Sequence, residues 1–372
     1  MFVCSTEMKE RLIVIFQHLH QNPEISWEEK KTTEYVKKLV EEAGCRVTTF
    51  KNHTGLIAEI GNGKPVIAIR ADIDALWQEV NGTFQANHSC GHDAHMTIVI
   101  GVLMLLKNTP IKGTIRFIFQ PAEEKGQGAI CMVNEQVVDD VDYLFGVHLR
   151  PFQEVPNGHG SPMIIHGACR FIDGNIIGDD LHGARPHLGA NAIEIGATLD
   201  QMLKTIHIDP LVPSSVKLTK FQAGGESSNI IPGHAKFSLD MRAQTNEAMD
   251  KMQGKIDLMI DALERFYEVK IPYQISSNVP AAVSNVDAVK KMKEAIIDVI
   301  GIDNYVPPIQ TTGGDDFHYY SIKRPQLKAT MLGLGCDLKP GLHHPNMVFD
   351  HEAIFTGSEI LATAAIYAIE KK

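Results

Sequence analysis

The 372-residue sequence has no apolar run long enough to cross a membrane. The longest run, residues 98–106, is about half of the roughly 20 residues that a spanning helix needs, so it predicts a buried helix. No secretion signal is expected either, because Lys9, Glu10 and Arg11 interrupt the N-terminal segment. The 35 Lys and Arg residues form no stripe and are outnumbered by 45 Asp and Glu, so neither nucleic acids nor membranes are expected partners.

The six cysteines form neither a CxxC pair nor a disulfide framework. They lie 38 or more residues apart, a spacing that favours a reduced, cytoplasmic protein in which a thiolate is available as a metal ligand. Hydrophobic residues make up 44% and charged residues 22% of the chain, which is ordinary globular usage and excludes a disordered or fibrous protein. The length predicts two domains.

Alternating apolar patterns in residues 1–167 and 280–372 predict an α/β domain with a mainly parallel sheet flanked by helices. Its first helix is expected at 8–20, and a capping box at 26–29 is expected to open a second helix that Gly44 closes. Further strands and helices of the N-terminal part are expected at 56–60, 65–69, 92–107, 114–119, 128–138 and 143–147.

Residues 168–279 show a different pattern, with two helices among four strands. The strands are expected at 170–177, 216–221, 235–241 and 269–275, and the helices at 191–206 and 246–267. This order predicts an inserted α+β domain of the ferredoxin-like kind. Nothing is predicted to cover the outer edge of its sheet, and an uncovered edge favours pairing with a second copy of the chain in a symmetric dimer.

Metal-capable and acid–base side chains are concentrated where expected strands end. Asp72 and Asp74 follow one strand, Glu123 and Glu124 follow another, and His148 ends a third. The carboxyl ends of strands in an open α/β sheet meet at one crevice. We therefore expect these side chains to lie in one pocket.

The sequence CGHDAH at 90–95 places four metal-capable side chains in six residues, before an apolar helix that gives no packing reason for them. This pattern predicts a metal site. In such a site one glutamate of the pair Glu123–Glu124 can bind metal while its neighbour transfers a proton; a solvated charged turn is the alternative. His343 and His344 are further candidates, with a polar turn as their alternative.

Seven short motifs, in order along most of the chain, resemble those of the dinuclear-metal amidohydrolases. This subfamily contains hippurate hydrolase, aminoacylases and plant auxin-conjugate hydrolases, within the larger aminoacylase and carboxypeptidase family. The motifs are RADIDAL (70–76), SCGHDAH (89–95), QPAEE (120–124), GVH (146–148), ARPH (184–187), SNIIP (228–232) and LHHP (342–345).

The resemblance implies a hydrolase that cleaves the amide bond of N-acyl amino acids in a catalytic domain with an inserted dimerisation or lid domain. It implies two divalent metal ions per chain, with Cys90 shared between them. The ligand set implied is Cys90, His92, Glu124, His148 and His343. The thiolate favours zinc, while imidazole and carboxylate ligands leave manganese, cobalt and nickel open.

The resemblance also implies roles for residues that bind no metal. Glu123 would be the general base, and His182 would polarise the scissile carbonyl, often in the active site of the partner subunit in a homodimer. Asn229 and Arg242 would hold the substrate carboxylate, and His187 would also contact the substrate.

Three departures from the family pattern bear on specificity and remove neither a ligand nor the base. Trp77 replaces the usual Pro-Ile and is followed by a short connection to the ligand motif, Asp315 replaces a glutamate, and Leu181 replaces a glycine. Two alternatives stay open. One is a dipeptidase or carboxypeptidase acting on short peptides, and the other is a catalytically silent metal-binding protein on the same fold.

Overall fold

The computed structural model describes residues 2–370, and the chain divides into two compact units. The first, here called the large unit, comprises Met1–Ile165, Val283–Gln310 and Asp316–Lys372. The second, the small unit, comprises His166–Ala282 and Thr311–Asp315. Two short strands lie where the chain passes between the units, β9 (Ile164–His166) and β16 (Ile309–Thr311).

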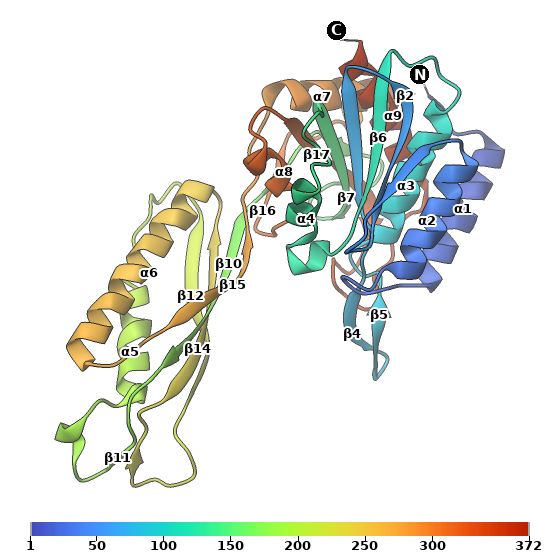
Figure 1. The fold of residues 1–372 in the computed structure, drawn as a ribbon. Helices are drawn as coiled ribbons and strands as arrows, with labels where there is room; N and C mark the ends of the chain where they lie inside the picture. Colours follow the sequence, from blue (N-terminus) through green and yellow to red (C-terminus); the bar gives the residue numbers. More distant parts are fainter. Residues whose placement is uncertain (1, 371–372) are drawn as a thin grey trace. The chain divides into compact units, whose positions relative to one another are not determined.

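The large unit is built on a seven-stranded sheet of order β1-β2-β6-β3-β7-β17-β8 (Figure 1). The pairs β6–β3, β3–β7 and β7–β17 are parallel, whereas β1–β2, β2–β6 and β17–β8 are antiparallel. The sheet is therefore mixed, and only its four central strands run parallel as expected. The strands are β1 (Arg46–Thr49), β2 (Leu56–Asn62), β3 (Val66–Asp72), β6 (Gly113–Gln120), β7 (Tyr143–Pro151), β8 (Gly160–Ser161) and β17 (Lys328–Leu338).

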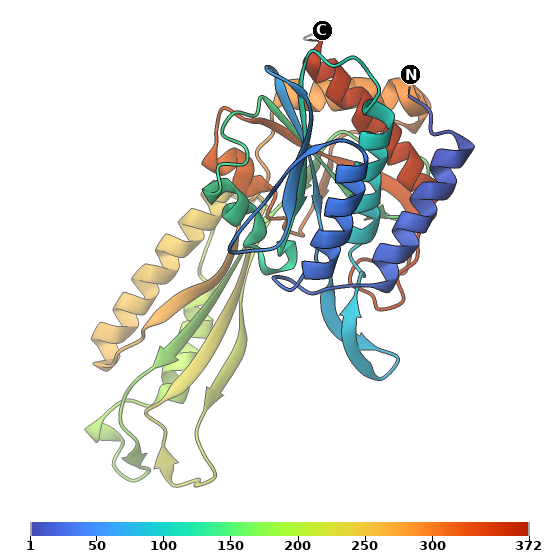
Figure 2. The same cartoon turned by 45° about the vertical axis from the view of Figure 1, so that its right-hand side comes forward.

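Helices cover both faces of this sheet (Figures 1 and 2). One core cluster joins one face to α1 (Thr6–Gln21), α2 (Lys30–Glu42), α3 (His92–Leu106), α7 (Val286–Ile300) and α9 (Glu352–Ile369). A second cluster joins the other face to α4 (Gly128–Asn134) and α8 (His318–Lys323). Among the described residues α9 alone is long and apolar enough to cross a membrane, but 67% of it is buried in this core.

The predicted capping box does not open α2. Glu29 is the N-cap residue and makes no side-chain capping bond, while Trp27 has a left-handed φ of 71°. The Ser26 hydroxyl instead donates to Asp74 Oδ2 at 2.7 Å. The segment before α2 is therefore held by a buried carboxylate and not by the helix end.

A β-hairpin, for which no strands were expected, follows the end of β3. It consists of β4 (Leu76–Val80) and β5 (Thr83–Asn87), joined by Asn81 and Gly82. These two residues have φ of 52° and 83°, the left-handed conformation that a tight two-residue hairpin turn requires. The hairpin ends just before the CGHDAH segment.

The small unit contains two helices and a four-stranded antiparallel sheet of order β12-β14-β10-β15. Both helices pack on one face of the sheet around a second core. The elements in chain order are β10 (Ala168–Ile176), α5 (Ala192–Leu203), β12 (Ser214–Ala223), β14 (Ala235–Ala243), α6 (Asn246–Tyr267) and β15 (Tyr273–Val279). This is the βαββαβ order of the ferredoxin-like motif.

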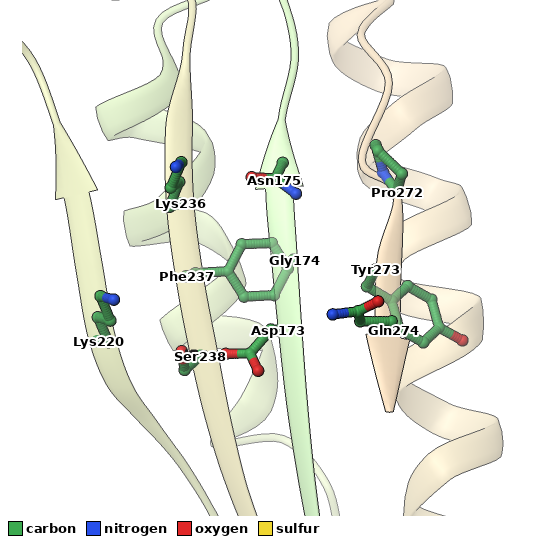
Figure 3. Close-up of a pocket in the computed structure, with 10 residues that line it drawn as sticks. All are labelled: Asp173, Gly174, Asn175, Lys220, Lys236, Phe237, Ser238, Pro272, Tyr273 and Gln274. Atoms are coloured by element: carbon green, nitrogen blue, oxygen red, sulfur yellow. Dashed lines mark hydrogen bonds between the residues drawn. The ribbon is translucent and has the colours of Figure 1, made fainter. Parts of the chain in front are cut away.

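The other face of this sheet carries polar side chains around a shallow cleft of about 420 Å³ (Figure 3). Lys220, Lys236 and Asp173 lie there, and Ser238 donates to Asp173 Oδ1 at 2.6 Å. None of the predicted site residues lines this cleft. The cleft therefore gives no reason to place the predicted active site on this face of the sheet.

Candidate active site

All five predicted ligand residues lie in one cluster beside the carboxyl end of β7. The thiol sulfur of Cys90 is 3.6 Å from His148 Nε2. The donor atoms of Cys90, His92 and His148 lie within 4.8 Å of one another, and so do those of Cys90, Glu124 and His343. Cys90 belongs to both groups of three and therefore occupies the centre of the cluster.

Two buried atoms in this cluster have no hydrogen-bond partner among residues 2–370, His92 Nε2 and Glu124 Oε1. They are 3.9 Å apart, and the glutamate oxygen is 3.5 Å from His343 Nε2. Buried polar atoms without partners are costly unless a ligand satisfies them. A thiol, three imidazoles and a carboxylate are donors that suit zinc and other transition-metal ions, so these residues fit a metal.

Burial favours the neutral form of four of the five ligand side chains; it would also lower the pKa of His92, but the charge of Asp72 raises that pKa well above its usual value. Burial raises the pKa of the Cys90 thiol well above its usual value and that of Glu124 to about 7. It also lowers the pKa of His148 well below its usual value and, together with the neighbouring His92, lowers that of His343. The neutral imidazoles of His148 and His343 are ready to bind a cation, whose charge would lower the pKa of the Cys90 thiol, the Glu124 carboxyl and the His92 imidazole.

Asp74 holds the turn that carries both glutamates. Its Oδ1 accepts a hydrogen bond from the Glu123 amide at 3.2 Å, and its Oδ2 accepts one from the Glu124 amide at 3.0 Å. His92 Nδ1 lies 2.8 Å from the Asp74 carbonyl oxygen, so this ring presents Nε2 to the cluster. Asp74 therefore positions His92 and the turn with the two glutamates by hydrogen bonds, and it is not one of the clustered donors.

The turn before the glutamates is tightly constrained. Ala122 has a left-handed φ of 50°, and its amide donates to the buried Glu29 Oε1 at 2.9 Å. At Gly128, which opens α4, a Cβ would lie 1.6 Å from the Pro121 carbonyl oxygen, so only glycine fits there. These contacts fix the position of the short 3₁₀ helix η1 (Glu123–Lys125).

Glu123 lies at the border of the cluster with a side chain that is 12% exposed. One carboxylate oxygen, Oε2, is 3.9 Å from His92 Nε2, and the other accepts from the Asp316 amide at 3.4 Å. The carboxylate can therefore reach a molecule bound at the cluster, as proton transfer requires.

The other two metal-capable residues of the CGHDAH motif are engaged elsewhere. Asp93 Oδ2 is 2.7 Å from His20 Nδ1. His95 Nδ1 is 2.7 Å from Asp72 Oδ1, and its Nε2 accepts from the Leu149 amide at 3.0 Å. Both ring nitrogens of His95 are thus committed, which leaves Cys90 and His92 as the free donors of this motif.

A buried ion network lies behind these residues. Arg70 donates to Asp72 at 2.5 Å and to Asp316 at 3.0 Å, and all three side chains are fully buried. Burial would raise the pKa of Asp72, but the charges of His92 and Arg70 hold it well below its usual value. Asp72 therefore stays anionic as the partner of the ring of His95.

The predicted residues of the small unit do not all lie together. His182 is in β11 (Leu181–His182), which pairs with β13 (Ile230–Ile231), and the Gly183 amide donates to the Asn229 carbonyl at 2.7 Å. His187 is in η2 (Pro186–Leu188), and all three predicted side chains are exposed.

Arg242 lies at the opposite end of the small unit's sheet. It is seven residues along β14 from Ala235, where the strand begins after β13, a separation of roughly 23 Å at the usual rise per residue. Its Nε donates to Asp240 Oδ1 at 2.7 Å, and its guanidinium lies 5.3 Å from the ring centre of Phe171. Within one chain the structure therefore does not bring Arg242 beside His182 and Asn229.

Sequence reasoning missed the supporting roles of Ser26 and Glu29. Their Ser-x-x-Glu spacing is the same as that of a capping box, so the local sequence predicts that they cap the helix and gives no sign that they support the site. Asp74 was placed among the potential ligands because it follows a buried strand. Its position was therefore predicted, but its hydrogen bonds to backbone amides were not.

Comparison with known proteins decides the family. Residues 68–367 match the family described as Peptidase family M20/M25/M40. The chain belongs to this family. This M20 chain is 31% identical over 380 aligned residues to N-acetyl-L-cysteine deacetylase of Bacillus subtilis, covering 96% of this chain and 88% of the relative. It is 30% identical to N-acetyldiaminopimelate deacetylase of Bacillus pumilus, covering 95% and 96%.

A solved structure from Bacillus subtilis, described as a dinuclear metal-binding peptidase of the M20 family, resembles this M20 chain throughout. The two share 27% identity with a TM-score of 0.83, covering 99% of this chain and 100% of the other. The predicted resemblance to the metal-dependent amidohydrolases is thus confirmed at the level of the family. The M20 chain is an enzyme of a hydrolase family with a candidate metal cluster in its large unit.

Proposed function

We propose that the protein is a metal-dependent amidohydrolase that cleaves N-acyl amino acids into a carboxylate and a free amino acid. The observation that carries this proposal is the Glu123 carboxylate, placed 3.9 Å from His92 at the border of a cluster of five metal-capable donors. Two similar proteins are deacetylases of an N-acetylated amino acid, which supports a substrate of this class.

Two divalent ions per chain would be held by the predicted ligand set. Cys90, His92 and His148 would surround one position, and Cys90 would share its sulfur with a second position beside Glu124 and His343. The ions would supply Lewis acidity and lower the pKa of a bound water. We propose zinc or manganese, and the imidazole and carboxylate ligands also suit cobalt and nickel.

The remaining roles, proton transfer, stabilisation of the oxyanion and substrate binding, would belong to side chains that bind no metal. Glu123 would take the proton of the attacking water and pass it to the leaving amine. His182 would donate a hydrogen bond to the oxyanion that develops on the scissile carbonyl, a contribution of about 3 kcal/mol. Asn229, Arg242 and His187 would bind the substrate, the first two at its carboxylate.

We propose that 1–167 and 280–372 form the catalytic domain and that 168–279 form a dimerisation and lid domain. The outer edges of strands β12 and β15 pair with no other strand among the described residues, so each edge can accept a second copy. A homodimer also explains how His182 of the β11–β13 pair and Arg242 near the end of β14, which lie apart within the small unit, could serve two different active sites. The six cysteines are all free, which supports a reducing, cytoplasmic location.

A substrate panel tests the proposed activity. Purified protein is supplied with each divalent metal and assayed on N-acetyl amino acids, hippurate and dipeptides, with the Glu123→Gln variant as the control for contaminating hydrolases. We expect metal-dependent release of amino acids from the N-acyl substrates. Faster cleavage of dipeptides would overturn the substrate class, and no cleavage of any substrate would overturn the activity.

Subunit mixing tests the dimer. His182→Ala and Glu123→Gln are each expected to be inactive, but a mixed dimer in which His182 acts on the partner's site has one complete active site. Random pairing at equal mixing makes half of the dimers mixed, so about a quarter of wild-type activity should return. No recovery despite demonstrated subunit exchange would show that His182 does not act across the interface.

A further inference from the structure

His343 differs from the other four predicted ligands because it lies in a loop, whereas they lie in or beside a helix or strand. Its side chain is 55% exposed, and its backbone has a left-handed φ of 63°. A residue that carries a side chain adopts this conformation at a cost and keeps it only where the surrounding structure holds it. Contacts with other segments are therefore expected to fix this loop.

Two segments hold the backbone of His343. Its amide donates to the Ser89 carbonyl oxygen at 2.7 Å, and its carbonyl oxygen accepts from Gln78 Nε2 at 3.0 Å. Ser89 directly precedes the ligand Cys90, and Gln78 lies in β4 of the hairpin β4–β5 (Figure 1). Both hydrogen-bonding groups of the His343 backbone are therefore engaged, one of them by a side chain.

Asn87, at the end of β5, orients the side chain of Gln78. Its Nδ2 donates to Gln78 Oε1 at 2.8 Å and to the Pro345 carbonyl oxygen at 3.0 Å. The two side chains lie on one face of the hairpin, because Asn87 pairs with Leu76, two residues before Gln78. With its oxygen bonded to Asn87, the Gln78 amide presents its NH₂ group to His343.

Trp77, which replaces the usual Pro-Ile of the family, lies next to Gln78 but points to the opposite face of the hairpin. Its side chain is 61% exposed. Of these two neighbours it is Gln78 that bonds to the ligand loop.

We propose that Gln78, oriented by Asn87, is a positioning residue that holds His343 in place for the metal ion beside Glu124. The inference rests on the proposed ligand set, in which Glu124 and His343 bind the same ion; Glu124 Oε1 is 3.5 Å from His343 Nε2. Without the hydrogen bond from Gln78, the loop must be ordered when the metal binds, and this ordering lowers the affinity. Loss of a group that orients a metal ligand typically weakens binding by about 10- to 100-fold.

Zinc titration of the full-length, chelator-treated protein against a competing chelator measures both binding steps. In Gln78→Glu the carboxylate still accepts from Asn87 but has no proton to donate to the His343 carbonyl oxygen. Gln85→Glu is the matched control, because Gln85 is exposed and lies directly opposite Gln78 in the hairpin, where it adds the same charge.

We expect one zinc ion to bind about 10- to 100-fold more weakly to Gln78→Glu than to wild type. A nearby negative charge alone strengthens the binding of a cation, so weaker binding reports the lost hydrogen bond. Gln85→Glu should bind both ions at least as tightly as wild type. Wild-type zinc affinities in Gln78→Glu would overturn the proposal.

A ligand variant shows whether Gln78 acts through His343. His343→Ala should bind the same ion more weakly, and adding Gln78→Glu to it should cause no further loss. An equal loss in both backgrounds would show that Gln78 acts by another route, and the proposal would be wrong. Wild-type affinities in His343→Ala would instead show that the proposed ligand set is wrong, and the inference would fail with it.

Gln78→Met keeps the test decisive if the glutamate disturbs folding. Methionine has a similar length, no charge and no donor for the His343 carbonyl oxygen. The hairpin strands are largely exposed, so the Tm of the metal-free variant should stay close to that of wild type. Folded Gln78→Met should lose affinity for the same zinc ion, and unchanged affinity would refute the positioning role.

Discussion

Replacement of Asp74 by asparagine tests how the metal cluster is supported. The Asp74 carboxylate accepts from the amides of Glu123 and Glu124 and, at 2.7 Å, from the hydroxyl of Ser26. An asparagine side chain has one acceptor oxygen, so its amide group must face one of these donors. A lost hydrogen bond to a charged group costs about 1.5–3 kcal/mol, and the unpaired donor adds to it. We expect the free energy of unfolding to fall by about 2–4 kcal/mol.

The same change should weaken metal binding by about 10- to 100-fold, because the Asp74 carboxylate positions the turn that carries Glu123 and Glu124. Urea unfolding of chelator-treated protein measures stability, and chelator competition measures affinity. Asp93→Asn is the matched control, since the Asp93 carboxylate is buried and its hydrogen bonds go to His20 and the Ala94 amide and not to a predicted ligand. Equal metal affinity in the two variants would refute the supporting role of Asp74.

Three further predictions concern other groups. Glu123→Gln should keep its metal and lose turnover, whereas Glu124→Gln should lose both; equal metal contents by elemental analysis would contradict the assigned roles. Hydrogen bonds from Lys328 and Tyr143 lower the pKa of Asp287 in the folded protein. The ionised Asp287 carboxylate therefore stabilises the folded state fully above the pKa of an unfolded aspartate, about 3.9, and this contribution is lost as the pH falls through the lower pKa of the folded state. Asp287→Asn should therefore reduce stability by less than about 1 kcal/mol at pH 7 and by less still near pH 3; an unchanged difference in urea titrations would contradict this. Burial raises the pKa of Cys336 to about 12, so iodoacetamide at pH 8 should label it only after unfolding, and early labelling in a mass spectrum would show that the thiol is accessible.

The clustering of the predicted ligands follows from local sequence signals. Glu124 and His148 were expected to meet because each is placed by the carboxyl end of a buried strand. Asp93 and His95 have the same chemistry as their neighbours in the motif, and only the family resemblance, not the spacing, left them out of the ligand set. In the structure Asp93 and His95 differ from the ligands because their side chains already interact with His20 and Asp72, which come from other parts of the chain.

The strands of the large unit were placed by their apolar patterns, but the pattern carries no direction. The expected sheet was mainly parallel, but β2 runs antiparallel to β6. Only residues 63–65 join β2 to β3, so these two strands run in opposite directions, and β6 is parallel to β3. The hairpin at 76–87 was missed because its strands are largely exposed and lack an apolar face. Its Asn81–Gly82 turn is the signal that could have found it.

The position of β17 in the sheet has a consequence for how the chain is made. β17 lies between β7 and β8, yet it is encoded after all of the small unit's continuous segment, His166–Ala282. During translation the small unit can fold while β7 still has an open edge. An open edge strand is a template for pairing with another chain. A ribosome that stalls before residue 328 would therefore release a product whose large unit is prone to aggregate, although its small unit is nearly complete.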